Sequence, residues 1–398
     1  MRVVICGAGI AGLAMAQRIH SHGWDVVVVE RSPGPREQGY MIDFFGLGYD
    51  AAETMGVLPR LQELGYYLPE ATFVDETGRR RAGISFKSFI RYTNGRMLSI
   101  MRPDLELALR EKVIGQVDLR FGVSVTDIAD FGEGVRVTLS DGAAVEADLL
   151  VGADGIHSTV RRQVFGDGFL RYLGFHTAAY TFTDARLHKL IGDRFIMTDT
   201  TNRQMGFYSL RDGRVAIFAV HRTPDPTLPA DPGEEIQRTY GSLGWIVPDA
   251  VASCPPPDRV YYDQVAQAIV PRWSRGRVVL LGDACQAVSL LAGQGATLAI
   301  AGAYVLGEHL ARATTIRDAL DGYEQQWRPV VTEKQRVGRN TAEWFLPSTR
   351  GRLFARRLAM RTARLPLLDA AYAASLAGRA DPSLDELTPR LDGQRLQA

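Results

Sequence analysis

The amino-terminal stretch VVICGAGIAGLAMA is the feature that most constrains the fold of this chain. An apolar run ends at Gly7, and the pattern G-x-G-x-x-G that follows leads into a run that favours a helix. A second apolar run extends from Asp25 to Glu30, after Gly23. Two such runs around one helix are typical of neighbouring buried strands in a parallel sheet. The sequence therefore predicts strands over 2–6 and 25–30, joined by a helix that ends near residue 22.

The same pattern predicts a dinucleotide site. Gly7 permits a tight turn, Gly9 lets the backbone approach a pyrophosphate, and Gly12 lets the helix pack closely on the strand. The phosphates would lie on the amino terminus of the helix. Glu30 ends the second strand, where its carboxylate can accept hydrogen bonds from a ribose. The motif by itself does not distinguish FAD from NAD.

Composition excludes several classes of protein. The chain has 398 residues, which is enough for two or three domains of ~100 to 200 residues each. Its 46 Lys and Arg residues nearly balance 45 Asp and Glu residues, so no overall charge favours nucleic acid or an anionic membrane. Three scattered cysteines form no disulfide framework, and no charged leader or apolar run of roughly 18 residues is found. We expect a cytoplasmic protein without stable membrane insertion and without a metal site.

The predicted secondary structure changes along the chain. Short β-like runs between residues 169 and 265 predict a second, sheet-rich domain. Asp141-Gly142 predicts a hairpin, and Asn94-Gly95 predicts another between FIRYT and RMLSIM. The chain becomes helical after Gly295. An Arg-rich stretch from residue 350 predicts a helix packed across the domains, with contact to anionic lipid as the alternative.

Two later motifs repeat the arrangement of a strand followed by a turn. Asp154-Gly155 follows the strand-like run ADLLVG, and Ser158 is placed to cap the next helix. Gly282-Asp283 follows RVVLL and precedes the glycine-rich helix entry Gly293-Gln294-Gly295. Two carboxylates at strand ends could reach hydroxyl groups of a long ligand.

In this order and at these separations, GAGIAG with Glu30-Arg31, GADGIHSTVR and GDACQAVSLLAGQGA resemble the three FAD motifs of the p-hydroxybenzoate hydroxylase-like flavoprotein monooxygenases. The resemblance extends from about residue 1 to residue 344. It implies an α/β fold: a Rossmann-like FAD-binding domain with a parallel sheet (1–72, 98–168 and 266–345), a β-sheet-rich substrate domain (73–97 and 169–265) and a C-terminal helical segment (346–398). It also implies that Asp154 lies in a loop that supports the cofactor site and that Asp283 binds the ribityl hydroxyls.

Further residues match this family. Arg102 precedes Pro103 at a predicted helix start, and the family has an arginine there against the flavin diphosphate; the alternative is a surface Arg that caps the helix. Met41 and Asp43 match a segment that passes the flavin ring, and the alternative is a buried loop with a capping Asp. The predicted cofactor contacts are Gly7, Gly9, Ile10, Ala11, Gly12, Glu30, Arg31, Met41, Asp43, Arg102, Asp154, Gly155, Gly282, Asp283, Leu290, Gly293, Gln294 and Gly295.

The third motif departs from the family at two positions. Gln286 stands where most relatives have His, and Leu290 stands where they have a Pro that packs beside the flavin ring. These departures motivate a second hypothesis, in which FAD is a scaffold for a non-redox step such as cyclisation. His157 beside Ser158 does not predict a nucleophile, and no catalytic residue is predicted with certainty.

The leading hypothesis follows from the family resemblance. It implies that NADPH or NADH transiently reduces the flavin and that a flavin C4a-hydroperoxide then hydroxylates or epoxidises a bulky aromatic, polyketide-like or terpenoid small molecule. Met205, Phe207 and Phe218 are the predicted substrate contacts, with ordinary core packing as the alternative. A lone His221 at a strand end is more typical of a structural residue. We expect a monomer or homodimer with no nucleic-acid partner.

Overall fold

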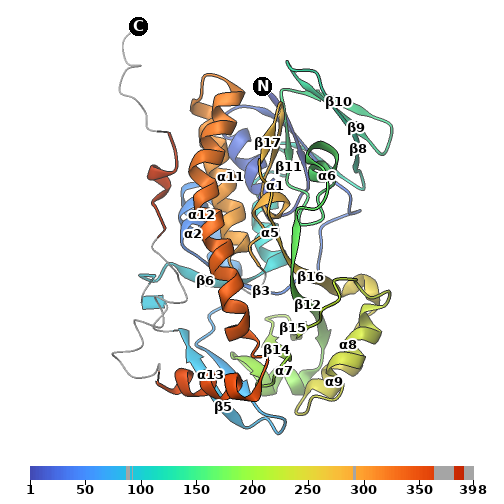
Figure 1. The fold of residues 1–398 in the computed structure, drawn as a ribbon, viewed down its shortest axis with the longest axis vertical. Helices are drawn as coiled ribbons and strands as arrows, with labels where there is room; N and C mark the ends of the chain where they lie inside the picture. The colour runs from blue at the N-terminus through green and yellow to red at the C-terminus, as the bar shows by residue number, and fades with distance from the viewer. Residues whose placement is uncertain (87–89, 92, 290–292, 363–380, 390–398) are drawn as a thin grey trace.

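The structure is a computed structural model, and it describes residues 1–86, 90–91, 93–289, 293–362 and 381–389. A parallel sheet with its helices forms one end of the elongated molecule, and a larger sheet forms the other end (Figure 1). The long helix α12 (Ile316–Phe345) runs from one end towards the other. This is the predicted mixed α/β architecture, while the predicted domain boundaries stay a prediction.

The first sheet has six strands in the order β17-β18-β11-β1-β2-β7. All neighbours pair in parallel except β17 and β18. Helix α1 (Ile10–His20) connects β1 to β2 and ends two residues before the predicted position. Both predicted strands are confirmed at their predicted bounds, and their interiors are buried. The strands are β1 (Arg2–Cys6), β2 (Asp25–Glu30), β7 (Asp118–Phe121), β11 (Leu149–Gly152), β17 (Ser274–Arg275) and β18 (Val278–Leu280).

Helices pack around this sheet. Helix α11 (Gly295–Arg312) contacts α1, α2 and α12, and almost all of its residues are buried. Glu308 of α11 is buried and forms ion pairs with Arg18 of α1 and Arg312 of its own helix. The remaining helices at this end are α2 (Leu47–Thr54), α3 (Leu58–Leu64), α5 (Arg102–Glu111), α6 (Thr159–Phe165) and α10 (Asp283–Gln286).

One predicted hairpin is confirmed and the other is wrong. A small sheet comprises β8 (Val125–Asp130), β9 (Val135–Leu139) and β10 (Ala144–Ala147). Its β9–β10 turn contains Asp141 and Gly142, and Gly142 has a φ of 86°. At Asn94-Gly95 a turn is present, with both φ values positive, but Ile90 and Arg91 before it are helical. Strand β6 (Met97–Met101) pairs instead with the distant β3 (Met41–Phe45), because that pairing buries Ile100 and Phe44.

The second large sheet has seven strands in the order β16-β12-β15-β14-β13-β4-β5. One face is covered by helices α7 (Ala185–Ile191), α8 (Pro232–Tyr240) and α9 (Val247–Ala252), which share a hydrophobic core with it. The other face turns towards β3 and β6. The strands are β4 (Glu70–Val74), β5 (Arg80–Ser85), β12 (Leu170–Thr183), β13 (Phe195–Thr198), β14 (Arg203–Ser209), β15 (Arg214–Arg222) and β16 (Tyr261–Ala268).

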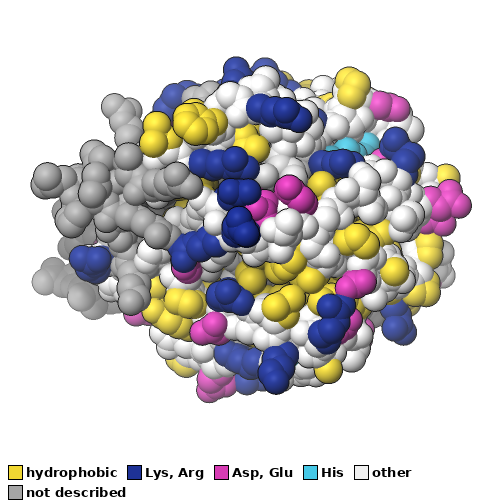
Figure 2. All heavy atoms as spheres, turned by 90° about the horizontal axis from the view of Figure 1, so that it is seen from below, with side chains coloured by type: hydrophobic (Ala, Val, Ile, Leu, Met, Phe, Trp, Pro, Cys, Tyr) yellow, Lys and Arg dark blue, Asp and Glu magenta, His cyan; other side chains and the backbone are white. Residues whose placement is uncertain are grey.

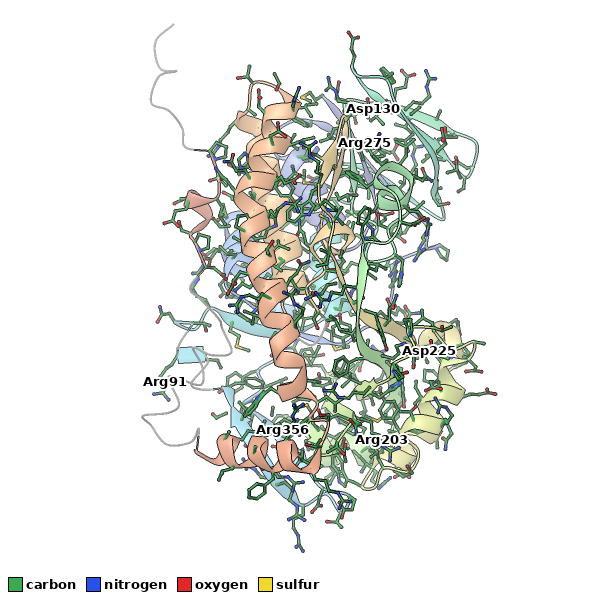
Figure 3. All side chains as sticks on the ribbon, viewed as in Figure 1. Arg91, Asp130, Arg203, Asp225, Arg275 and Arg356 are labelled. Carbon is green, nitrogen blue, oxygen red and sulfur yellow. The ribbon has the colours of Figure 1, made fainter. Side chains whose placement is uncertain are left out.

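The predicted Arg-rich helix is α13 (Arg350–Thr362), and it packs on the seven-stranded sheet near β5 (Figure 3). Arg356 is buried, and its guanidinium donates to Oδ1 of Asp199 at 2.8 Å. Arg357 donates to the other oxygen at 2.6 Å, and the Arg356 guanidinium lies 4.7 Å from the centre of the Phe73 ring. A buried, paired arginine therefore attaches α13 to the sheet.

The face of the molecule shown in Figure 2 carries basic, acidic and hydrophobic side chains side by side. Within the described ranges, none of the helices is both long enough and apolar enough to cross a membrane.

Replacing Asp199 with Ala should destabilise the protein by about 3–5 kcal/mol, because the buried Arg356 would lose its counter-charge. Urea unfolding followed by circular dichroism measures this change. Asp249→Ala is the matched control: Asp249 pairs with Arg186 on the exposed surface, and its loss should cost about 0–1 kcal/mol. Equal effects of the two substitutions would contradict the role of Asp199.

Candidate functional site

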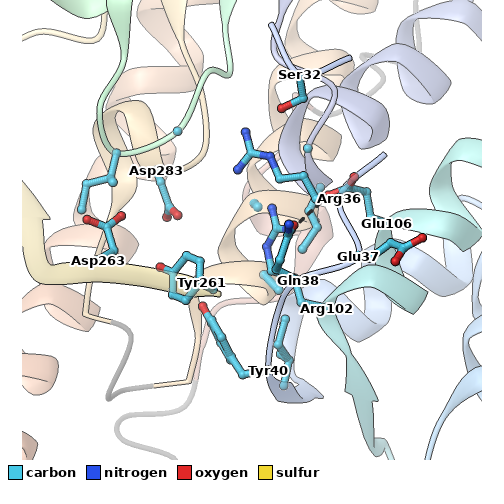
Figure 4. Close-up of a pocket in the computed structure, with 18 of the residues that line it drawn as sticks. Ser32, Arg36, Glu37, Gln38, Tyr40, Arg102, Glu106, Tyr261, Asp263 and Asp283 are labelled. Carbon is cyan, nitrogen blue, oxygen red and sulfur yellow. Dashed lines mark ion pairs between the residues drawn. The ribbon is translucent and has the colours of Figure 1, made fainter. Parts of the chain in front are cut away.

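A cavity of about 1650 Å³ lies between the parallel sheet and the seven-stranded sheet. A site for one small ligand usually measures ~300–1,000 Å³, so this cavity has room for a dinucleotide and a second molecule. In Figure 4, Asp263 and Asp283 lie on one side of the cavity and Arg36, Gln38 and Arg102 on the other. The predicted residues that line it are Gly7, Gly9, Ile10, Ala11, Glu30, Arg31, Met41, Asp43, Arg102, Asp154, Gly155, Asp283, Gly293, Gly295 and Phe218.

Three loops at the carboxyl ends of β1, β11 and β18 pack directly against one another. A Cβ atom on Gly7, whose φ is 107°, would lie 2.4 Å from the carbonyl oxygen of Ala153. A Cβ atom on Gly282, whose φ is 60°, would lie 2.6 Å from Cβ of Ala11. These glycines are therefore needed for the loops to approach one another. Gly12 acts in the same way within the first loop, because its Cβ atom would overlap the carbonyl oxygen of Gly7.

A buried arginine links the second loop to the third. Arg161 of α6 donates hydrogen bonds of 2.7 Å to the carbonyl oxygens of Ala284 and Ile156. Ser158 caps α6, as predicted, by accepting a hydrogen bond from the backbone N–H of Arg161. Gly12, Gly282 and Gln294 are buried and do not line the cavity.

The carboxylate of Glu30 lies beside the glycine-rich turn. It accepts hydrogen bonds from the backbone N–H groups of Ala8, at 2.9 Å, and Ser32, at 3.0 Å. Desolvation acts to raise the pKa of Glu30, but these hydrogen bonds and the Arg36 charge outweigh it, so its pKa is lowered. Glu30 is therefore a charged acceptor at the position where an adenosine ribose would lie.

Arg102 lies over the first loop. A Cβ atom on Gly9 would be 3.7 Å from Nη2 of Arg102, which places the guanidinium at the amino terminus of α1. Its Nη1 atom lies 3.2 Å from Oε2 of Glu106. A helix amino terminus and a guanidinium together favour a phosphate at this point.

The two strand-end aspartates differ in their surroundings. Both oxygens of Asp154 already accept hydrogen bonds, from the Ser158 hydroxyl and from the backbone N–H groups of Thr159 and Val160. Asp154 therefore holds its own loop and leaves little capacity for a ligand. The carboxylate of Asp283 faces the cavity and has no hydrogen-bond partner among the described residues. Desolvation raises the pKa of Asp283, although the Arg102 charge opposes this, so hydroxyl donors would stabilise its charged form.

Sequence reasoning missed several cavity residues contributed by distant segments. Tyr40 lies 5.7 Å from Tyr261 and 5.6 Å from Phe218, measured between ring centres. Asp263 of β16 accepts a hydrogen bond of 2.9 Å from Nε2 of His157 in the second loop. No motif marks these positions, since β16 reaches the loops only through the fold.

One of the three predicted substrate contacts lines the cavity. Met205 and Phe207 share one face of β14, as the alternation predicts. The prediction that this face lines the substrate cavity is wrong. Both side chains are fully buried against the core of α7, α8 and α9 and do not line the cavity. Tyr208 lies on the cavity face and stacks on Phe195 with ring centres 4.3 Å apart. Phe218, from the neighbouring β15, lines the cavity as predicted.

Gln286 does not lie beside the cavity. It is buried, and its Nε2 atom donates to the hydroxyl of Tyr323 on α12. A Cβ atom on Gly302 would lie 2.9 Å from its Oε1 atom, so Gln286 fills a small space between α10, α11 and α12. Leu290, the other departure, lies outside the described residues.

Comparison with known proteins agrees with this geometry. A family model described as an FAD binding domain matches residues 1–337. FAD-dependent monooxygenase asL6 of Sarocladium schorii is 30% identical over 374 residues, which cover 85% of this chain and 86% of that protein. The chain belongs to the p-hydroxybenzoate hydroxylase-like FAD-dependent monooxygenases. An uncharacterised Mycobacterium tuberculosis protein, Rv1260, is 36% identical over 327 residues, covering 78% of this chain and 85% of its own length.

Solved structures share the fold of this monooxygenase. HpxO of Klebsiella pneumoniae, complexed with FAD and uric acid, aligns with a TM-score of 0.80 at 23% identity, over 95% of this chain and 97% of its own. The tetracycline destructase Tet(51) aligns with a TM-score of 0.80 at 22% identity, over 96% of this chain and 98% of its own.

The cavity of the monooxygenase fits FAD. Asp283, whose carboxylate has no partner among the described residues, lies on one side of the cavity, and the Arg102 guanidinium lies on the other side, over an open helix amino terminus. Glu30, a charged acceptor, lines the same cavity. These residues would hold the ribityl chain, the diphosphate and the adenosine ribose, in that order. When bound, FAD supplies redox and oxygen-transfer chemistry, and the protein supplies position and exclusion of water.

Asp283→Ala should weaken FAD binding by about 10- to 100-fold, because it removes a charged acceptor of hydroxyl donors. The flavin-to-protein ratio of purified, folded protein measures this loss. Asp249→Ala removes a carboxylate outside the cavity and should keep its full flavin content. A fully flavinated Asp283→Ala protein would contradict the assignment.

Tyr323→Phe tests the position of Gln286. It leaves a buried amide donor without its acceptor and should lower the free energy of unfolding by about 1–3 kcal/mol. Flavin content and the visible flavin spectrum should stay unchanged, since neither residue lines the cavity. Loss of flavin at unchanged stability would contradict this position.

Proposed function

We propose that the protein uses NADPH or NADH and O2 to hydroxylate or epoxidise a bulky, largely apolar small molecule with aromatic, polyketide-like or terpenoid character. The observation that carries this proposal is the cavity itself, which continues from the FAD motifs to an aromatic wall on the seven-stranded sheet. Phe195, Tyr208, Phe218 and Phe345 contribute to that wall. Aromatic walls with few polar groups are typical of sites for flat apolar ligands.

The residues of this chain have distinct parts in such a reaction. The wall on β14 and β15 would hold the substrate rings against the ring end of the flavin site. The β3–β6 ribbon and the Phe345 side chain line the cavity and would help to keep water from the reacting atoms. No ionisable triad is needed, since FAD supplies the oxidising chemistry.

The non-redox alternative has lost one of its two motivations. Gln286 contacts α12 and not the ring end of the cavity, so its departure from the family does not bear on flavin chemistry. No described side chain favours a scaffold role for FAD over a redox role.

Isotope labelling tests the proposal. A panel of hydroxylated polycyclic aromatics is incubated with the FAD-loaded protein, NADPH or NADH, and 18O2. We expect at least one compound to stimulate nicotinamide oxidation and to gain one labelled oxygen atom, seen as a mass increase of the product. Product that forms without reductant, without O2 or without label would overturn the proposal.

A further inference from the structure

Helix α13 has two opposite faces, and one of them packs on the seven-stranded sheet. Leu353, Arg356 and Met360 are buried, and they recur at the spacing of one face of a helix. Met360 packs in a cluster with Phe73 of β4, and Arg356 pairs with Asp199. This inward face accounts for the attachment of α13 to the sheet.

The opposite face of α13 is apolar and exposed. Four exposed residues follow the same helical spacing: Gly351, Phe354, Ala355 and Leu358. Phe354 is 66% exposed and Leu358 is 53% exposed. Every other large hydrophobic side chain that is exposed among the described residues has no second one within four positions of the chain. Scattered exposed hydrophobic side chains are ordinary, but two on adjacent turns of one helix face indicate a binding surface.

Arginines flank this apolar face. Helix α13 contains five Arg residues and no Asp or Glu, although the net charge of the whole chain is only +1. At about 100° per residue, Arg350 and Arg352 lie on either side of the stripe that contains Phe354 and Leu358, and both arginines are exposed. A helix that lies on a membrane has this arrangement, because long cationic side chains reach the phosphates while the apolar side chains enter the acyl boundary.

Helix α13 lies at one extremity of the molecule. It packs on the seven-stranded sheet near β5, at the end opposite to the parallel sheet (Figure 1). Figure 2 views this end from below and shows basic side chains next to hydrophobic ones. A flat partner can therefore approach this end of the molecule.

We propose that the outward face of α13 binds the surface of an anionic phospholipid membrane, with Phe354 and Leu358 in the acyl boundary and Arg350 and Arg352 at the phosphates. The binding is peripheral and reversible, because two large apolar side chains bury too little surface for permanent anchoring. Nucleic acid would use the positive charge but leave the apolar side chains exposed. A second copy of the same face would bring two groups of arginines together, which repel each other.

Co-sedimentation with lipid vesicles tests this surface. The FAD-loaded, full-length protein is mixed with vesicles of phosphatidylcholine that contain about one third phosphatidylserine, or with vesicles of phosphatidylcholine alone. We expect about tenfold or tighter binding to the anionic vesicles than to the neutral ones. This binding should weaken as ionic strength rises, because salt screens the attraction between the arginines and the headgroups.

Phe354→Ser combined with Leu358→Ser removes the apolar contact and should weaken binding to anionic vesicles by about 10- to 100-fold. Ile114→Ser combined with Phe131→Ser is the matched control. These side chains are 64% and 55% exposed, and they lie outside α13, after α5 and between β8 and β9. The control variant should bind as the wild type does. Both double variants should keep the wild-type flavin content and melting temperature, so that a change in binding reports on the surface.

A second pair of variants tests the charge. Arg350→Gln removes one cation beside the apolar stripe and should weaken binding to anionic vesicles by about 3- to 10-fold. Arg317→Gln, at the exposed start of α12, removes a cation at a distance from α13 and should leave binding unchanged.

The inference is overturned if the wild type does not bind anionic vesicles, or binds both kinds of vesicle equally. Full binding by the α13 double variant would also overturn it, because the charge alone would then recruit any polyanion. Analytical ultracentrifugation supplies a further outcome: a wild-type dimer that the α13 double variant converts to a monomer would show that the face joins two copies of the chain instead. These measurements need neither substrate nor reductant, so their outcome is separate from that of the isotope experiment.

Discussion

The close packing of three loops at the carboxyl ends of β1, β11 and β18 is the constraint on which the rest of the structure depends. Gly7 lies against Ala153, Gly282 lies against Ala11, and Arg161 donates to Ala284. No side chain can be added at either glycine without moving backbone, so the three loops form one unit. That unit creates the helix amino terminus and the wall along which a dinucleotide would lie.

The carboxylates in and around this unit differ in how many hydrogen bonds they already accept. Asp154 accepts three hydrogen bonds within its own loop, and Glu30 accepts two from backbone N–H groups. Among the described residues, neither Asp283 nor the second oxygen of Asp43 has a hydrogen-bond partner, and both residues line the cavity. Because both carboxylates can still accept hydrogen bonds, they are where ligand hydroxyls would contribute most. Asp283 belongs to the predicted cofactor site after β18, and Asp43 belongs to the β3–β6 ribbon.

Local patterns predicted local structure well. The bounds of β1 and β2, the Ser158 cap and the turn at Asp141-Gly142 were all readable, because each depends on residues close in the chain. The hairpin at Asn94-Gly95 failed since β6 finds a better apolar partner about fifty residues earlier in β3. The sequence also could not predict which side of β14 faces the cavity. Alternation identifies two faces, but only the packing of α7, α8 and α9 decides which one is covered.

The sequence by itself determined the family, the cofactor and the β-α-β unit, because the glycine spacing and the three motifs encode short-range backbone requirements. Tertiary structure alone decided that Gln286 serves α12 rather than the flavin, that Tyr208 and not Phe207 faces the cavity, and that Asp43 is held by Ser99. These outcomes depend on contacts between segments far apart in the chain, whose relative placement no local pattern specifies.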